Sequence, residues 1–240
     1  MTHMDTKDAR ETQTLELLLD TIGAASVDPL IECTKDTCQR KARLAIAILG
    51  KIKDPRSGPA ILPFLHDARW RYRATAAGSL GDLADSAYFV PLVEASRDSD
   101  FSVVRAALIS LGKLKVNGVV DQLLVNLKHP NYTVRYAALY ALKDQGATAA
   151  PLIQRRLENS QGVDRAYLAE ALGRLKDEST LSTLTDLLED RDPIVRAYAA
   201  DVLANFPRQF ALVNNLKRLL QDPSDLVRGR ARIALEAFQQ

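Results

Sequence analysis

The sequence has little cysteine and no long hydrophobic run, and each scarcity excludes a class of protein. Cys33 and Cys38 are its two cysteines, and their spacing matches no zinc or redox motif. We therefore expect a reduced, cytoplasmic setting. No apolar stretch approaches the roughly 18 residues needed to span a bilayer, and no secretory signal opens the chain. The sequence predicts neither a disulfide scaffold nor a membrane protein.

An excess of charge of one sign is also missing. The chain has 32 Lys and Arg against 30 Asp and Glu, a formal net charge of +2. A surface for nucleic acid or for an anionic membrane would ordinarily need a larger basic excess. The sequence also lacks a glycine-rich phosphate loop, a nucleophile elbow and a cluster of metal ligands. We therefore expect no catalytic residue, no metal and no cofactor, and no binding to nucleic acid or membrane.

What the sequence does contain is an internal repeat of about 31 residues. Each repeat can be aligned on its anchor, the residue that directly follows a Leu shared by all seven repeats. The anchors are Gly50, Gly81, Gly112, Lys143, Gly173, Ala204 and Glu236. Ala stands five residues before the anchor in six repeats, and Leu168 takes its place in the fifth. This agreement indicates a repeat protein.

Each repeat carries two stretches with the apolar spacing of a helix, separated by turn residues. No stretch has the sustained alternation of a strand. The recurring Ala lets neighbouring helices pack closely, and a two-helix repeat can bury its apolar face only against its neighbours. The sequence therefore predicts an all-α fold, a right-handed α-solenoid of about seven two-helix repeats.

We expect one continuous array of these repeats over residues 25–240. Residues 12–24 are predicted to form an N-terminal capping helix. Residues 1–11 are predicted to be disordered, and their opening "MTHM" resembles a cloning scar.

A pattern of charge accompanies the repeat. Five repeats have Asp fourteen residues before the anchor, whereas His129 and Asn159 stand there in the fourth and fifth. Five repeats have Arg eight residues before the anchor, and two have it seven before. We predict a structural Asp–Arg ladder along the stack; the alternative is a row of arginines that binds anions. The ladder residues are Asp36, Arg43, Asp67, Arg73, Asp98, Arg105, Arg135, Arg165, Asp190, Arg196, Asp222 and Arg228.

Three segments resemble a known class of repeat. They are "VRAALISLGKLK" (104–115), "VRYAALYALKD" (134–144) and "VRAYAADVLANF" (195–206). They are similar to the HEAT-like repeats of phycobilisome lyases and related armadillo-like helical proteins. The resemblance covers residues 25–240 and implies the fold more firmly than an activity.

The resemblance implies a non-catalytic scaffold that binds a partner protein on its concave face. The alternative is a phycobilin lyase subunit, or a related chromophore-handling factor, that binds a bilin and a phycobiliprotein. HEAT-like deoxyhypusine hydroxylases need His–Glu pairs as iron ligands. Here His3, His66 and His129 are followed by Met, Asp and Pro, so we expect no such enzyme. HEAT-like DNA glycosylases would need a basic concave face, which the net charge does not favour.

The second helix of each repeat is expected to line the concave face. Its exposed positions should lie seven and three residues before the anchor and one after it. Tyr and Arg at such positions are typical anchors of protein interfaces. The alternatives are ordinary solvated residues, or a tetrapyrrole site in which Arg or Lys meets propionates. The predicted partner-binding residues are Arg105, Ile109, Lys113, Tyr136, Tyr140, Arg43 and Lys51.

A second aromatic row stands eleven residues before the anchor, at Trp70, Phe101 and Tyr132. We expect these side chains to pack against the following repeat. The alternative is a rail on which bases or a ligand would stack.

Overall fold

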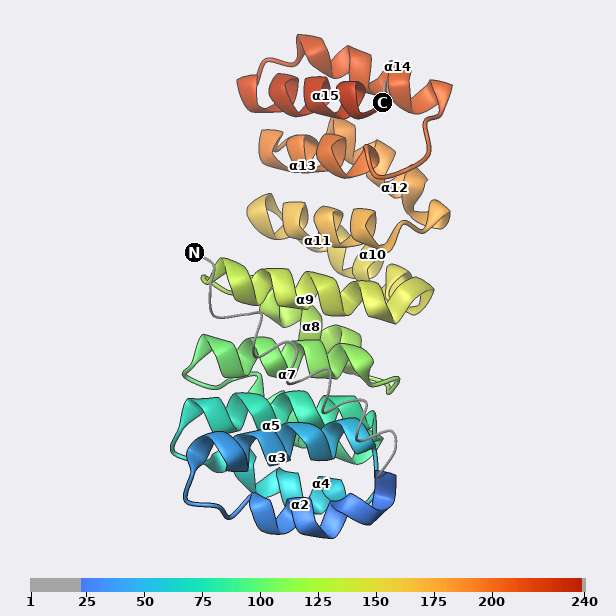
Figure 1. The fold of residues 1–240 in the computed structure, drawn as a ribbon. Coiled ribbons are helices and arrows are strands. Elements are labelled where there is room, and N and C mark those ends of the chain that lie inside the picture. Colours follow the sequence, from blue (N-terminus) through green and yellow to red (C-terminus); the bar gives the residue numbers. More distant parts are fainter. Residues whose placement is uncertain (1–22, 239–240) are drawn as a thin grey trace. The chain divides into compact units, whose positions relative to one another are not determined.

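The chain is all-α over residues 23–238, which are the residues that the computed structural model describes. Fourteen α-helices alternate with short 3₁₀ turns in this range, so the prediction of seven helical hairpins is confirmed (Figure 1). The first helices of the hairpins are α2 (Val27–Cys33), α4 (Ser57–Ile61), α6 (Phe89–Ala95), α8 (Val119–Asn126), α10 (Ala150–Glu158), α12 (Leu181–Asp186) and α14 (Phe210–Arg218). The second helices are α3 (Gln39–Ile52), α5 (Trp70–Leu83), α7 (Phe101–Lys113), α9 (Tyr132–Gln145), α11 (Gly162–Leu175), α13 (Pro193–Leu203) and α15 (Asp225–Ala237).

Seven 3₁₀ turns extend or join these helices. They are η1 (Gly23–Ser26), η2 (Leu62–His66), η3 (Ser86–Tyr88), η4 (Gly146–Thr148), η5 (Glu178–Thr180), η6 (Leu187–Glu189) and η7 (Leu219–Gln221). The predicted disordered segment 1–11 lies outside the described residues. So does the predicted capping helix 12–24, apart from Gly23 and Ala24, which begin η1.

The helices form two compact units that divide between Val116 and Asn117. The division falls in the loop between the third and fourth repeats. In the first unit α5 packs between α3 and α7. In the second unit α11 packs against α9 and α13, and α13 packs in turn against α15. The single array over residues 25–240 stays a prediction.

The repeat positions found in the sequence form the core of each unit. The Leu before the anchor is fully buried in the first six repeats. In the seventh repeat the equivalent Leu235 is only half-buried, because no following hairpin covers it in the described chain. The residue five before the anchor, Ala in six repeats and Leu168 in the fifth, is buried throughout. Neighbouring hairpins therefore bury their apolar faces against each other.

Anchor glycines mark close approaches of neighbouring second helices. A Cβ atom added at Gly173 would lie 2.2 Å from the Cβ of Val202 on α13. One added at Gly81 would lie 2.3 Å from the Cβ of Ser110 on α7. Glycine is thus needed at these anchors because the adjacent helix fills the space of any side chain.

Candidate functional site

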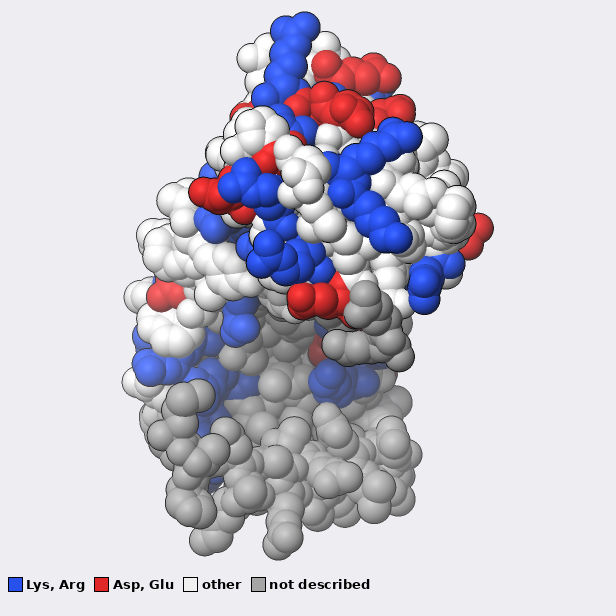
Figure 2. Space-filling model, turned by 90° about the horizontal axis from the view of Figure 1, so that it is seen from above, with Lys and Arg blue, Asp and Glu red and all other residues white. Residues whose placement is uncertain are grey.

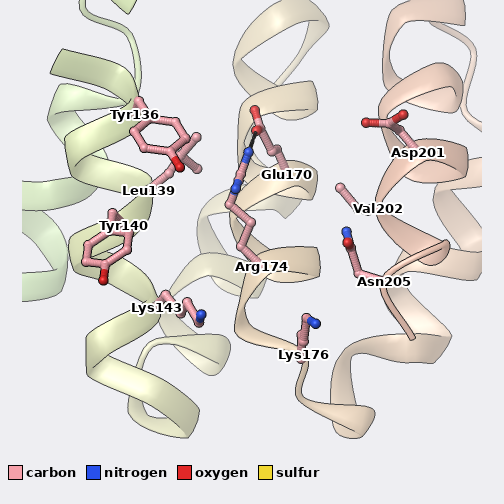
Figure 3. Close-up of a pocket in the computed structure, with 10 residues that line it drawn as sticks. All are labelled: Tyr136, Leu139, Tyr140, Lys143, Glu170, Arg174, Lys176, Asp201, Val202 and Asn205. Atoms are coloured by element: carbon pink, nitrogen blue, oxygen red, sulfur yellow. Dashed lines mark hydrogen bonds and ion pairs between the residues drawn. The ribbon is translucent and has the colours of Figure 1, made fainter. Parts of the chain in front are cut away.

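A groove of about 410 Å³ crosses α9, α11 and α13 in the second unit (Figure 3). Its lining residues are Tyr136, Leu139, Tyr140, Lys143, Glu170, Arg174, Lys176, Asp201, Val202 and Asn205. Six of these ten occupy the positions, relative to their anchors, at which exposed residues were predicted. The groove is therefore formed by the open face of the second helices, each of which contributes side chains from successive turns.

Two tyrosines form one wall of the groove. Tyr136 and Tyr140 are 45% and 51% exposed, and they lie one helical turn apart on α9. The guanidinium of Arg174 lies 5.5 Å from the centre of the Tyr136 ring, which is within range of a cation–π contact. Figure 3 shows the Tyr136 ring and the Arg174 side chain facing each other from adjacent helices. Both tyrosines thus expose ring surface to the groove while the helix holds them in place.

The prediction of an exposed residue seven positions before the anchor was wrong for α11 and α13. Ala166 and Ala197, seven residues before their anchors, are buried. The next residues, Tyr167 and Tyr198, are half-buried instead, and their rings meet edge to face at 6.1 Å. A shift of one residue turns a side chain by about 100° around the helix. The recurrence of Tyr at the same position of two successive repeats was a signal that could have identified them.

The tyrosines of the second unit form an aromatic cluster larger than the predicted pair. The rings of Tyr132 and Tyr136 lie 6.1 Å apart, and the guanidinium of Arg135 lies 5.2 Å from the Tyr167 ring. Burial is the main cause that raises the pKa of Tyr198, and the Glu170 carboxylate adds to it. This phenol therefore stays protonated at neutral pH.

The charges that line the groove are not balanced. Glu170 accepts two hydrogen bonds from Arg174, the shorter of 2.8 Å. Asp201 pairs with Arg230 at 3.2 Å. Lys143, in the last turn of α9, and Lys176, which caps α11, are both exposed. Neither lysine forms an ion pair with any residue of the described chain. Two ammonium groups are therefore left over after the acidic residues of the groove are paired.

Two of the predicted binding residues in the first unit are held by a carboxylate. Asp82 on α5 lies 3.0 Å from the ammonium of Lys51 and 2.5 Å from that of Lys113. Burial acts to raise the pKa of Asp82, but the hydrogen bonds from Lys113 and Lys51 outweigh it and lower this pKa. The same position of three successive repeats thus forms a Lys–Asp–Lys bridge across α3, α5 and α7.

The other predicted residues of the first unit lie on α3 and α7. Arg105 is exposed, whereas Ile109 and Arg43 are half-buried. Arg105, Ile109 and Lys113 belong to the first unit, and Tyr136 and Tyr140 belong to the second. The residues of the predicted patch are therefore divided between the two units.

The ladder positions organise the loop inside each hairpin. The side chain fourteen residues before the anchor accepts a hydrogen bond from the backbone N–H two residues later in six repeats. Asp98 accepts it from Asp100 at 2.8 Å, and His129 accepts it from Asn131 through Nδ1 at 3.0 Å. The others are Asp36, Asp67, Asp190 and Asp222. This short-range bond turns the chain into the second helix.

The arginines join this loop to the next one. Arg196 donates from Nη1 to the carbonyl of Asp190, and from Nε and Nη2 to both oxygens of Asp222 at 2.8 Å. Arg73 contacts Asp67 and Asp98 in the same way. Arg165 donates from Nε to Asp190 at 2.7 Å. The bidentate, partly buried ion pairs of Arg73 and Arg196 are stronger than ordinary surface pairs.

The structure differs from the expected ladder at four arginines. Arg43 and Arg105 form no ion pair with any described residue of their unit, because each stands one residue later in its repeat and points about 100° away. Arg135 bonds to the carbonyls of His129 and Pro130 but contacts tyrosine rings in place of a carboxylate. Arg228 bonds to the loop of its own repeat and to Asp225.

The second aromatic row is more exposed than its expected packing against the following repeat would allow. Trp70, Phe101 and Tyr132 are all exposed, and Tyr132 is the most exposed at 65%. Each is the first residue of its helix, so its side chain points back toward the loop and off the stack. Tyr132 belongs with the aromatic cluster of the second unit, since its ring contacts Tyr136.

The described residues do not provide a metal site. No group of three or more His, Cys, Asp or Glu in residues 23–238 is placed to hold a metal ion. The Nδ1 atom of His129 is used in its loop, and His66 ends η2. His3 lies outside the described residues. Cys33 and Cys38 are exposed, free thiols, and none of the described helices is long and apolar enough to cross a bilayer.

The charged side chains are mixed on the face seen in Figure 2. Lys and Arg are interspersed with Asp and Glu over the part of this view that is described. A uniform basic field of the kind that tracks nucleic-acid phosphates is not present on this face.

Comparison with known proteins supplies the family. The model of HEAT repeats matches residues 27–112, 89–166 and 149–236. This chain belongs to the HEAT-repeat family. Rice deoxyhypusine hydroxylase-B is 26% identical over 253 residues, covering 90% of this chain and 83% of the rice protein. Zebrafish deoxyhypusine hydroxylase is 30% identical over 125 residues, covering 50% of this chain and 40% of that protein.

Two solved structures share the architecture of the HEAT-repeat chain. The Escherichia coli protein YIBA aligns with a TM-score of 0.56 at 20% identity, covering 99% of this chain and 89% of that one. The complex of CpcE and CpcF of phycocyanin lyase from Nostoc aligns with a TM-score of 0.50 at 23% identity, covering 88% and 94%. These likenesses concern the fold. The described residues contain no ligand cluster for the iron that the resemblance to HEAT-like hydroxylases would imply.

Proposed function

We propose that this HEAT-repeat protein is a non-catalytic adaptor that binds a partner protein through the open face of its second helices. The groove across α9, α11 and α13 is its main contact surface. The observation that carries the proposal is the placement of Tyr136 and Tyr140, half exposed on a rigid helix beside unpaired cations. Exposed aromatic side chains next to Arg are typical of protein interfaces.

The tyrosines can supply a useful part of a binding free energy. A Tyr side chain offers about 200 Å² of surface, so the exposed half of each ring is about 100 Å². Burying it would contribute about 2.5 kcal/mol per tyrosine at ~25 cal/mol per Å². Because helix packing already fixes α9, little ordering entropy opposes this gain.

The predicted residues of the first unit are assigned a smaller role. Arg105 and Ile109 remain proposed contacts on α7, and Arg43 on α3. Lys51 and Lys113 already share Asp82, so a partner's carboxylate would have to compete with a half-buried ion pair. We expect their substitution to affect affinity less than loss of the tyrosines.

The test is a capture experiment with a matched aromatic control. The baits are wild-type protein, the double variant Tyr136→Ala/Tyr140→Ala and the control Phe210→Ala, each incubated with lysate of the source organism. Mass spectrometry then compares the proteins that each bait captures. Phe210 is 83% exposed on α14, away from the groove residues. A true partner is captured by wild type and by Phe210→Ala and is lost with the tyrosine variant. A set of captured proteins that is identical for all three baits would refute the proposal.

A bilin-handling role, as in a phycobilin lyase subunit, is the second candidate. The observation that favours it is that Arg174 and Lys143 lie beside the tyrosine rings in one groove, a chemistry suited to the propionates and rings of a tetrapyrrole. Titration of the protein with phycocyanobilin tests it. A change in visible absorbance that disappears with Tyr136→Ala/Tyr140→Ala would support it, and an unchanged spectrum would refute it.

A further inference from the structure

The unpaired ammonium groups indicate which kind of segment the groove accepts. Glu170 is neutralised by Arg174, and Asp201 by Arg230. Lys143 and Lys176 are left without a carboxylate within the described chain. Both stand at C-terminal ends of second helices, where the partial negative charge of the helix offsets about half of one charge. Two ammonium groups without a carboxylate partner in the described chain favour an anionic ligand.

The usual separation of packed helices, two of which carry these lysines, fits an extended chain. Lys143 belongs to α9 and Lys176 to the end of α11, and packed helices lie about 8–10 Å apart. In a polyproline II chain, residues three apart lie on the same side and are separated by about 9 Å. Carboxylates at every third residue of such a chain can therefore meet successive helices.

The other residues that line the groove favour an extended peptide over a compact ligand. The exposed faces of Tyr136 and Tyr140 can receive proline or aliphatic side chains, as in other aromatic grooves for extended peptides. The side-chain amide of Asn205 is exposed and forms no hydrogen bond with the described residues. It can donate to one backbone carbonyl and accept from one N–H of a bound strand.

We propose that the groove binds an extended acidic segment of a partner protein, with carboxylates at every third residue contacting Lys143 and Lys176 and with apolar side chains over Tyr136 and Tyr140. This inference rests on the proposed adaptor function and names the chemistry of the partner.

The experiment uses fluorescence anisotropy with the full chain. The probe is a fluorescein-labelled peptide of Glu-Pro-Pro repeats, and the comparison peptides replace Glu with Gln or with Lys. We expect the Glu peptide to bind more tightly than the Gln peptide and the Lys peptide not to bind. Because the contacts are exposed, raising the salt concentration should weaken binding.

Charge-reversal variants locate the binding surface. Lys143→Glu/Lys176→Glu should weaken the Glu peptide about tenfold or more, since two exposed ion pairs are lost and two repulsions are added. The matched control is Lys217→Glu/Arg218→Glu on α14, which changes the net charge equally outside the groove. Circular dichroism checks that both variants keep the helical fold.

The outcomes separate this inference from the adaptor function. Equal affinity for the Glu and Gln peptides, or equal weakening by both double variants, would refute the proposal that the segment is acidic. The groove would then still be a site that binds a peptide. Absence of binding for every peptide would also overturn it, and the capture experiment with Tyr136→Ala/Tyr140→Ala would then decide the adaptor function alone.

Discussion

The anchor glycines provide the sharpest prediction of stability. Replacing Gly173 with Ala should destabilise the protein, although Ala is the better helix former. A Cβ at this position would lie 2.2 Å from Cβ, 2.7 Å from Cγ2 and 2.9 Å from Cγ1 of Val202. All three distances are far below van der Waals contact, so α11 and α13 would have to move apart.

The magnitude follows from two opposing contributions. Gly→Ala inside a helix stabilises by about 1 kcal/mol. Overpacking of a core typically costs about 1–3 kcal/mol and sometimes more. Since the clash involves a backbone-linked Cβ that cannot rotate away, we expect a net loss of about 1–2 kcal/mol or more.

Gly229 is the matched control in the same unit. It lies inside α15, and a Cβ there would meet nothing within 4 Å. Gly229→Ala should therefore stabilise by about 0.5–1 kcal/mol. One substitution made at two helical glycines should thus change stability in opposite directions.

Urea unfolding followed by circular dichroism measures both effects as shifts of the midpoint at constant m. A double-mutant cycle with Val202→Gly isolates the clash, because this second change removes all three atoms that the new Cβ would meet. The double variant should be less destabilised than the sum of the single variants by about 1–3 kcal/mol. A Gly173→Ala protein as stable as wild type, or a cycle that sums to zero, would refute the close-approach argument.

Three further predictions concern the ladder. Asp222→Asn should lower the free energy of unfolding in urea by about 1.5–3 kcal/mol, because Arg196 loses a bidentate carboxylate partner in a largely buried setting. Asp201→Asn, which breaks an exposed ion pair, should lower it by less than about 1 kcal/mol. Equal losses for the two variants would contradict this. Hydrogen bonds from arginines lower the pKa of Asp67, Asp98 and Asp222. The stabilisation from these carboxylates is therefore full above the unfolded-state pKa of ~4 and is lost as the pH falls through the lowered folded-state pKa values. A urea midpoint that stays constant when the pH is lowered below 4 would contradict this. Asn159→Asp should raise stability by up to about 1 kcal/mol by giving Arg135 a carboxylate partner, and an unchanged midpoint would show that this loop cannot bring the two together.

Much of the architecture could be predicted from the sequence because it depends on periodic local signals. The Leu before each anchor and the Ala five before it repeat with the spacing of packed hairpins, and nearly all of these side chains are buried. The Asp of the ladder was predictable for the same reason, since its bond to the backbone two residues later is made within one loop.

The candidate site could be predicted only in part. Tyr136 and Tyr140 stand at positions that the helical period assigns to the open face. Tyr167 and Tyr198 were missed because a helix can turn about its own axis by one residue without disturbing its apolar pattern. The bridge from Lys51 through Asp82 to Lys113 was also missed, although it joins equivalent positions of three repeats.

The sequence alone determined the all-α class, the number of repeats and the register of the buried positions, because each is set by residues within one hairpin and its period. The tertiary structure decided which charges are paired, which tyrosines share a surface and where two helices leave no space for a methyl group. These properties depend on the rotation and separation of neighbouring helices. Many side chains set that packing together, and no single repeat specifies it.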